Sequence, residues 1–414
     1  MDQQRKRLFA DLTPLRVSRE FRLLWSGEVI TVTGQQVTVV ALFIQVYAIT
    51  KSPAAVGLVG LVEFLPLVLG TAIGGPLIDR YDRRRILQLT QLLLASTSGV
   101  LLYTALAENP RLWLIYTAAG VAAFVGGIDV PARQATTPVL VDKKLLQSAL
   151  SLNIVMWNVS VITGPFIGGV VVGTAGLEWA YAIDVVTYGV AIVLVSVMKP
   201  IPPAGQAIEK TGWESFKEGV SYLKGRRVIQ STFVIDMFAM VFGLPEALFP
   251  ILAVTKFDGG PTETGILFTS IAVGALIASV TTGWTHRIKH QGQAVVWMVV
   301  LWGAAIVVFG FSANLWAACF FLAIAGAADT ISAVFRSTIL QSSLTDEMRG
   351  RITSIHFLVV SGGPRLGNVE SGLVAQWTSP LLAIVSGGLV CILGALGVAV
   401  FVPDFWRYHA GEDT

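Results

Sequence analysis

Three acidic residues of this 414-residue chain lie inside long apolar stretches, where a charged side chain needs an explanation. They are Glu28, Glu63 and Asp236. A carboxylate at the centre of a bilayer costs about 3 kcal/mol or more unless it is paired, protonated or in contact with water. Such a group can bind a proton in one conformation and release it in another. We therefore interpret these three residues as candidates for proton coupling.

A second set of polar residues is predicted to line a wet cavity that holds a small molecule. Arg365 stays charged under all conditions, so it requires either an acidic partner or an anionic ligand such as a catecholate or a carboxylate. The sequence leaves open a fixed pair with Glu370 or with an acid across the cavity. Gln35 belongs to a polar stripe with helical spacing that we expect to face the same cavity. The stripe consists of Glu28, Thr31, Gln35, Thr38 and Gln45.

The composition indicates that membrane helices position these residues. The chain is 54% hydrophobic and 13% charged, with a mean hydropathy of +0.70, whereas soluble domains are about 25% charged. Apolar runs of about 20 residues cross the hydrocarbon core as helices, and they exclude a porin-like barrel, whose strands are about 10 residues long. We predict twelve spans: 22–48, 53–78, 86–107, 111–138, 147–173, 179–198, 228–254, 263–284, 293–312, 315–340, 351–376 and 379–402.

The distribution of basic residues predicts the topology. With the N-terminus inside, 23 of the 29 Lys and Arg residues fall in inner segments, three in outer loops and three within spans. Positive loops are retained in the cytoplasm, so we expect both termini to be cytoplasmic in a bacterial inner membrane. The net charge of +3 then reflects topology, and no nucleic-acid partner is expected.

The chain divides into two similar halves. The polar stretch 199–227 lies between six predicted helices in 1–198 and six in 228–414, and it contains an amphipathic segment from Trp213. An alternative is that 199–227 is a plain tether. Asp129 with Arg133 near the end of the fourth helix has a counterpart in Asp329 with Arg336 near the end of the tenth, and we assign both pairs to gating. Repeated halves place a substrate site at their interface and work by alternating access.

Several function classes are excluded by missing motifs. There is no Gly-x-x-x-x-Gly-Lys-Ser/Thr loop for ATP binding and no His-Glu-x-x-His zinc motif. His286 and His290 are four residues apart but have no third ligand nearby, and Cys319 and Cys391 fall inside predicted helices. We expect no metal, no cofactor, no disulfide and no enzymatic activity.

A charge-dense turn at 74–87, Gly-Gly-Pro-Leu-Ile-Asp-Arg-Tyr-Asp-Arg-Arg-Arg-Ile-Leu, separates the second and third predicted helices. It resembles the signature of the major facilitator superfamily at this position, with Asp82 where that pattern has glycine. The resemblance implies that Asp79 caps a neighbouring helix and that an arginine of the turn pairs with Asp129, which locks an outward-open state. The alternative is that the arginines only set topology. The gating residues in the turn are Gly75, Asp79, Arg80, Arg83 and Arg84.

A glycine and proline motif lies in the fifth predicted helix. Gly164, Pro165, Gly168 and Gly169 resemble the Gly-Pro-x-x-Gly-Gly motif of antiporters in the same superfamily. Proline removes a backbone hydrogen bond, and the glycines admit close contact between helices. The resemblance implies export with limited proton leak, while generic packing of small residues is the competing interpretation. The arginine that drug antiporters often carry on helix four is replaced by Tyr116.

Along most of its length the chain is similar to the enterobactin exporter subgroup of the superfamily and its drug-efflux relatives. The resemblance implies an all-α membrane protein with 12 transmembrane helices in two pseudo-symmetric six-helix bundles. We expect a monomeric, proton-coupled secondary active exporter of a small amphipathic molecule in the lipid bilayer, with an enterobactin-like siderophore as cargo. Two alternatives stay open: a multidrug or antibiotic:proton antiporter, and a non-transporting membrane receptor.

Overall fold

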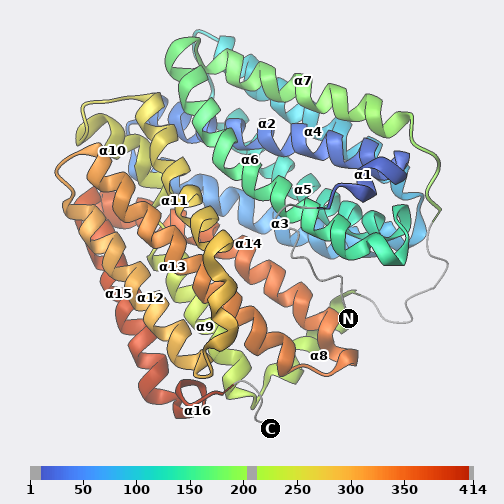
Figure 1. Ribbon diagram of the computed structural model, residues 1–414. Helices are drawn as coiled ribbons and strands as arrows, with labels where there is room; N and C mark the ends of the chain where they lie inside the picture. Colours follow the sequence, from blue (N-terminus) through green and yellow to red (C-terminus); the bar gives the residue numbers. More distant parts are fainter. Residues whose placement is uncertain (1–10, 203–211, 410–414) are drawn as a thin grey trace.

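The computed structural model describes residues 11–202 and 212–409, and this part of the chain is helical without strands (Figure 1). Eleven helical segments are long and apolar enough to cross a membrane. The more charged α14 (Asp346–Trp377) lies beside them and completes the predicted 12-helix major facilitator fold. The first six spans are α2 (Arg19–Thr50), α3 (Pro53–Arg80), α4 (Arg83–Leu106), α5 (Leu112–Leu140), α6 (Leu146–Thr174) and α7 (Leu177–Ser196).

The remaining spans follow the short linker helix α8 (Gly212–Leu223). They are α9 (Arg227–Phe242) with η2 (Glu246–Leu248) and α10 (Phe249–Thr255), then α11 (Pro261–Thr281), α12 (Gln291–Phe311), α13 (Leu315–Ser342), α14 and α15 (Pro380–Phe401). Shorter elements are α1 (Thr13–Val17), η1 (Lys143–Leu145), η3 (Thr282–Arg287) and α16 (Pro403–Trp406).

The predicted span at 228–254 is present as Arg227–Thr255, but its helix is interrupted between α9 and η2. Gly243 and Pro245 lie in the break, and Pro245 cannot donate a backbone hydrogen bond. The groups freed at the break find other partners. The Trp302 indole N–H donates to the Gly243 carbonyl over 2.9 Å, and the Asn368 side-chain oxygen accepts from the Ala247 N–H over 3.0 Å.

The spans pack as two groups of helices. In the first group α3 packs on α5, α4 packs on α7, and α2 packs on α6 and α7. In the second group α11 packs on α13, and α12 packs on α13 and α15. The two groups meet mainly through α3 with α14 and through α6 with α11.

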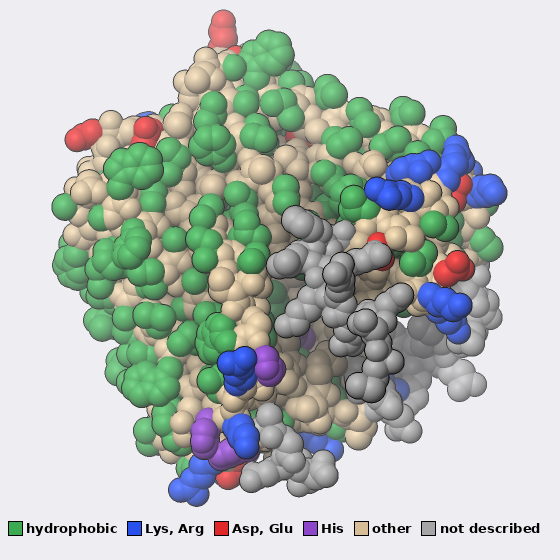
Figure 2. Space-filling model, viewed as in Figure 1, with side chains coloured by type: hydrophobic (Ala, Val, Ile, Leu, Met, Phe, Trp, Pro, Cys, Tyr) green, Lys and Arg blue, Asp and Glu red, His purple; other side chains and the backbone are tan. Residues whose placement is uncertain are grey.

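The groups approach most closely at one end of the molecule. We call the end with the turn 80–85 and α8 the basic end, and the other the opposite end; Figure 2 shows Lys and Arg side chains gathered at the former. At the opposite end Gly57 lies against the backbone of Gly372, and Gly169 against that of Gly265. Both contacts depend on the absence of a Cβ. In Figure 1 the two groups converge near α10 and diverge toward α8.

The predicted amphipathic linker helix is present as α8, although it packs on protein as well as facing outward. Gly219 lies against Ile355 of α14, Tyr222 and Leu223 join an apolar cluster with residues of α9 and α14, and Glu218 pairs with Arg351 over 2.7 Å. The side chains of its first two predicted apolar residues, Trp213 and Phe216, lie outside the described part of the structure.

Gly274 offers a test of the packing in the second group. A Cβ at this position would meet the backbone of Ala323 on α13. We expect Gly274→Val to lower the free energy of unfolding by about 1–3 kcal/mol through overpacking, measured as a reduced Tm in detergent. Gly99→Val is the control, because a Cβ there meets nothing within 4 Å. Equal Tm values for the two variants would contradict this packing.

Candidate functional site

A buried ion pair lies in α5 between Asp129 and Arg133, two residues whose spacing of four in the sequence predicts that they are neighbours on a helix. Arg133 Nε donates to Asp129 Oδ2 over 2.6 Å, and both side chains are 8% exposed. Asp129 Oδ1 also accepts from the Thr90 hydroxyl at 2.5 Å and from the Gln91 amide at 3.0 Å, both on α4. Three donors therefore satisfy the Asp129 carboxylate, as a buried charge requires.

A second buried cluster lies in the other group of helices. Arg336 Nη2 on α13 contacts Asp236 Oδ1 on α9 over 2.8 Å and Asp329 Oδ1 over 3.3 Å. The side chains of Arg336 and Asp236 are 6% and 3% exposed. Asp236 Oδ2 and Arg336 Nη1 are buried and have no hydrogen-bond partner among the described residues. This cluster therefore keeps an unused donor and an unused acceptor.

The two clusters occupy equivalent places. Glu28 on α2 is half-buried and interacts electrostatically with Arg133. Glu28 lies nine residues after the start of α2 at Arg19, and Asp236 lies nine residues after the start of α9 at Arg227. Each group thus has an arginine of its fourth span in contact with an aspartate of that span. The acid of the first span also contacts the arginine in the second group, whereas Glu28 interacts with Arg133 only through its electrostatic field, without an ion pair among the described residues.

We call these two sets the acid–arginine clusters: Glu28, Asp129 and Arg133 in the first group, and Asp236, Asp329 and Arg336 in the second. From sequence, Glu28 and Asp236 were assigned to proton coupling and the others to gating. The structure brings both kinds of residue together in each group.

A third ion pair joins the two groups of helices. Arg365 Nε on α14 donates to Glu63 Oε2 on α3 over 3.1 Å, and Arg365 Nη1 donates to the Ser361 carbonyl over 2.6 Å. The Arg365 and Glu63 side chains are 27% and 21% exposed. The acidic partner of Arg365 is thus the acid on the other group and not Glu370, whose buried Oε2 has no partner among the described residues.

Glu246 is a further acid that the sequence analysis did not single out; it falls near the outer end of the predicted span 228–254, where solvation is the ordinary expectation. The structure places it on η2, in the break of the seventh span, where it is half-buried and interacts electrostatically with Arg365 and Glu63. Gly243 and Pro245 were the available signal, because interrupted membrane helices often mark a binding site.

Asp184 on α7 falls near the outer end of the predicted span 179–198, but it is not solvated. Its side chain is buried and accepts hydrogen bonds from Ser98 at 2.7 Å and from Thr38 at 2.8 Å. These contacts lie inside the first group, so Asp184 holds α2, α4 and α7 together.

The polar stripe on α2 does not face a single cavity as predicted. Thr38 binds Asp184, and Thr31 is buried against its own helix. Gln45 is buried between Thr104 and Tyr181, whose hydroxyl donates to the Gln45 side-chain oxygen over 2.7 Å. Of the stripe, Gln35 is exposed and Glu28 is half-buried. Residues seven apart share a helix face, so these two form the shorter stripe that remains available to a ligand.

The charged turn anchors the end of α7 and the start of the linker. Arg84 donates to the carbonyls of Val195 and Ser196. Asp82 caps α4 by accepting from the Arg84 N–H over 2.9 Å, and the same oxygen accepts from the Ile201 N–H over 3.2 Å. The carboxylate that replaces the superfamily glycine thus holds the linker against the turn.

The contacts that the superfamily resemblance implied for the turn are not formed in this structure. Arg83 donates to the Ala135 carbonyl over 2.8 Å, whereas Asp129 pairs with Arg133. Among the described residues the side chains of Asp79 and Arg80 form no hydrogen bond or ion pair, although the Arg80 guanidinium lies 6.0 Å from the centre of the Tyr81 ring, and a Cβ on Gly75 would meet nothing within 4 Å. These residues are free to engage another surface in a different conformation.

The glycine and proline motif packs α6 on two neighbours. Cβ atoms at Gly164 and Gly168 would meet Gln36 and Val37 of α2, and one at Gly169 would meet Gly265 of α11 in the other group at 2.7 Å. Pro165 lies inside α6. Close helix packing is therefore part of what this motif does, and its antiporter role stays a prediction.

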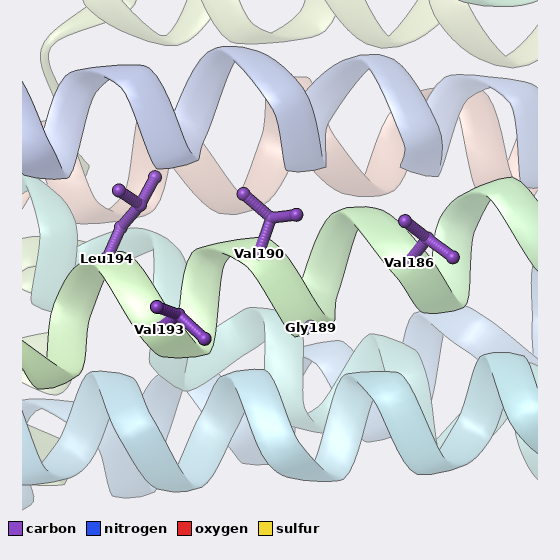
Figure 3. A pocket seen from close by; sticks show the side chains of 5 residues that line it. All are labelled: Val186, Gly189, Val190, Val193 and Leu194. Carbon is purple, nitrogen blue, oxygen red and sulfur yellow. The ribbon is translucent and has the colours of Figure 1, made fainter.

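A shallow groove of about 430 Å³ runs along the outer face of α7 (Figure 3). Its lining is apolar and consists of Val186, Gly189, Val190, Val193 and Leu194. It has no polar group that could orient a substrate, and such a surface suits a lipid chain. Among the described residues no three His, Cys, Asp or Glu side chains converge as metal ligands, and His290 stacks on His409 instead of His286.

Among the described residues, eleven candidate membrane spans and α14 form two groups of helices that an ion pair joins, which is the architecture of a multi-pass membrane protein. The chain belongs to the transmembrane secretion effector family of the major facilitator superfamily, whose model matches residues 9–407.

Curated relatives span nearly the whole chain. The enterobactin exporter EntS of Citrobacter koseri is 27% identical and covers 93% of this chain and 92% of its own. That of Shigella boydii is 25% identical and covers 95% and 94%. Among solved structures, nucleoside transporter NupG matches 94% of this chain and 100% of its own with a TM-score of 0.77 at 12% identity. A POT family transporter in complex with 5-aminolevulinic acid has a TM-score of 0.75 over 94% and 97%, at 11% identity.

The first acid–arginine cluster predicts a large effect for Arg133→Met. The variant leaves Asp129 as a buried charge without its counter-ion, so we expect the free energy of unfolding to fall by about 3–5 kcal/mol, seen as a lower Tm in detergent. The double variant Arg133→Met with Asp129→Asn should recover most of the loss. Arg85→Met, at an exposed arginine of the turn, is the control. No recovery in the double variant would contradict the pairing.

Proposed function

We propose that this transporter is a proton-coupled exporter of a small amphipathic anion of the siderophore class. The observation that supports this most is the Glu63–Arg365 pair at the junction of the two groups, because it combines a protonatable acid with a permanent cation. An exporter driven by protons needs both kinds of group where its two halves meet. The relatives named enterobactin exporter favour a catecholate cargo.

The mechanism we propose is alternating access by two bundles, 1–198 and 228–414, joined by the linker 199–227. The basic end is assigned to the cytoplasm from the positive charge of its loops, which places both termini there. With the opposite end closed by α3–α14 and α6–α11, the present state is inward-facing. Opening of the opposite end would bring the basic ends together, where Asp79 and Arg80 are available to lock them.

The residues divide between three tasks in this proposal. Arg365, Gln35 and Glu370 contact the cargo, and Glu28, Glu63 and Asp236 carry protons. The pairs Asp129–Arg133 and Asp329–Arg336 set the gates, together with Gly75, Asp79, Arg80, Arg83 and Arg84 of the charged turn. Gly164, Pro165, Gly168 and Gly169 keep α6 tightly packed so that protons do not leak past the cargo.

A multidrug:proton antiporter is the alternative, because the apolar helices around the polar groups would also suit a lipophilic drug. A non-transporting receptor is the alternative from another class. The two acid–arginine clusters favour a transporter over a receptor, since repeated buried charges suit a machine with two equivalent moving halves.

Transport by inside-out proteoliposomes tests the function. With an acidic lumen, we expect a catecholate siderophore to accumulate inside the vesicles and to accelerate the loss of protons from the lumen, reported by a trapped pH dye. A lipophilic cationic dye serves as the drug probe. Accumulation of the dye in place of the siderophore would favour the multidrug alternative, and binding of either probe without flux would overturn transport.

Glu28→Gln tests proton coupling. The substitution keeps the size of the side chain and removes its charge, so we expect proton-driven accumulation to fall at least about tenfold while cargo exchange without a gradient persists. The measurement is initial flux at two values of lumen pH. Glu108→Gln, at an exposed loop carboxylate, is the matched control. Unchanged pH dependence of flux in the Glu28 variant would contradict the assignment.

A further inference from the structure

The break in the seventh span brings η2, which carries Glu246, against α14 and α3, the helices that carry Arg365 and Glu63. Glu246 on η2 and Glu63 on α3 both interact electrostatically with this guanidinium and with each other. The Asn368 side chain, three residues after Arg365 on α14, accepts from the Ala247 N–H over 3.0 Å, so η2 is fixed against α14. Glu246 and Arg365 therefore belong to the same group of helices, whereas Glu63 belongs to the other.

One guanidinium can neutralise one of these two carboxylates. η2 packs against α14, α3 and α10, and α10 carries no charged residue. Within the described part of the chain, Arg365 and Glu63 are the charged groups with the largest electrostatic effect on Glu246. An ionised carboxylate without a partner is costly within a membrane. The acid that does not contact Arg365 is then the one that carries a proton.

We propose that a proton and an ion-pair partner are exchanged between the two groups of helices: the proton is transferred between Glu246 and Glu63, and Arg365 changes its carboxylate partner in the opposite direction. We call this exchange the hand-off. In the present state Arg365 binds Glu63, and the proton is on Glu246. When the opposite end opens, α3 moves away from α14, Arg365 transfers to Glu246, and the proton leaves the Glu246 carboxyl for the Glu63 carboxylate. One O–H bond breaks and one forms, no electrons change hands, and the proton moves in the direction opposite to the arginine.

The hand-off makes Glu246 a positioning residue for Arg365 as well as a proton site. This inference rests on the proposed alternating access but not on the cargo. Its test therefore uses neither cargo nor a proton gradient, so a failure of transport and a failure of the hand-off are separate results.

Distance measurements between two labels at the opposite end give the test. Lys51 and Thr378 are exposed and flank the Ser52–Gln376 hydrogen bond, which joins the groups over 2.8 Å. Both would be replaced by Cys in a background with Cys319→Ala and Cys391→Ala, spin-labelled, and measured in lipid nanodiscs. A short distance reports the closed end and a long distance the open end.

Glu63→Gln imitates a protonated Glu63, so Arg365 should bind Glu246 and the long-distance population should increase. Glu246→Gln imitates the protonated Glu246 of the present state, so the end should stay closed with an unchanged Tm. The double variant offers Arg365 neither acid. Its open-to-closed ratio should be at least about tenfold lower than that of Glu63→Gln, the loss expected for one charge-assisted hydrogen bond.

Glu108→Gln controls for the loss of a carboxylate at the same end and should match the parent protein. The proposal is overturned if Glu63→Gln stays folded and closed, or if the double variant opens as much as Glu63→Gln. It is also overturned if Glu246→Gln opens the end, because Glu246 would then be needed as a charged partner in the closed state.

Discussion

A guanidinium stays protonated in a membrane, so Arg365 requires a nearby acid that compensates its charge. Its partner in this structure, Glu63, comes from the other group of helices, so the charge is compensated across the contact of α3 with α14. The close approach of these two helices is made possible by Gly57, Gly60 and Gly372, where a side chain would collide with the facing backbone. Electrostatics and packing thus stabilise the same contact.

Within each group, a buried arginine also has acidic partners, but these come from the same group of helices. Arg133 and Arg336 are more deeply buried than Arg365, and each has an acid on its own helix and another on the first span of its group. These pairs do not cross the junction, so each compensates charge within its own group of helices. The ion pairs within a group thus differ from the Glu63–Arg365 pair, which joins the two groups.

The broken seventh span lies in the second group of helices and contributes to the contact between the two groups. Trp302 and Asn368 satisfy backbone groups that the break would otherwise leave without partners, in keeping with the demand that membrane-embedded backbone be hydrogen-bonded. The break brings Glu246 to Arg365, and the charged turn at the basic end holds the linker through Asp82. Local departures from regular helix or from the family pattern thus occur at the places where the groups are joined.

The sequence by itself determined the helical membrane fold. The length of each apolar segment decides whether it spans the bilayer, and the basic residues of the loops decide its orientation, and both are local properties of the sequence. It also determined the Asp129–Arg133 pair, since residues four apart on a helix are neighbours whatever the tertiary structure. Only the tertiary structure decided that Arg365 contacts Glu63 and not Glu370, that Glu28 joins Arg133, and that Asp184 and Gln45 are internal. These contacts join different helices, and their distances depend on crossing geometry that no single helix encodes.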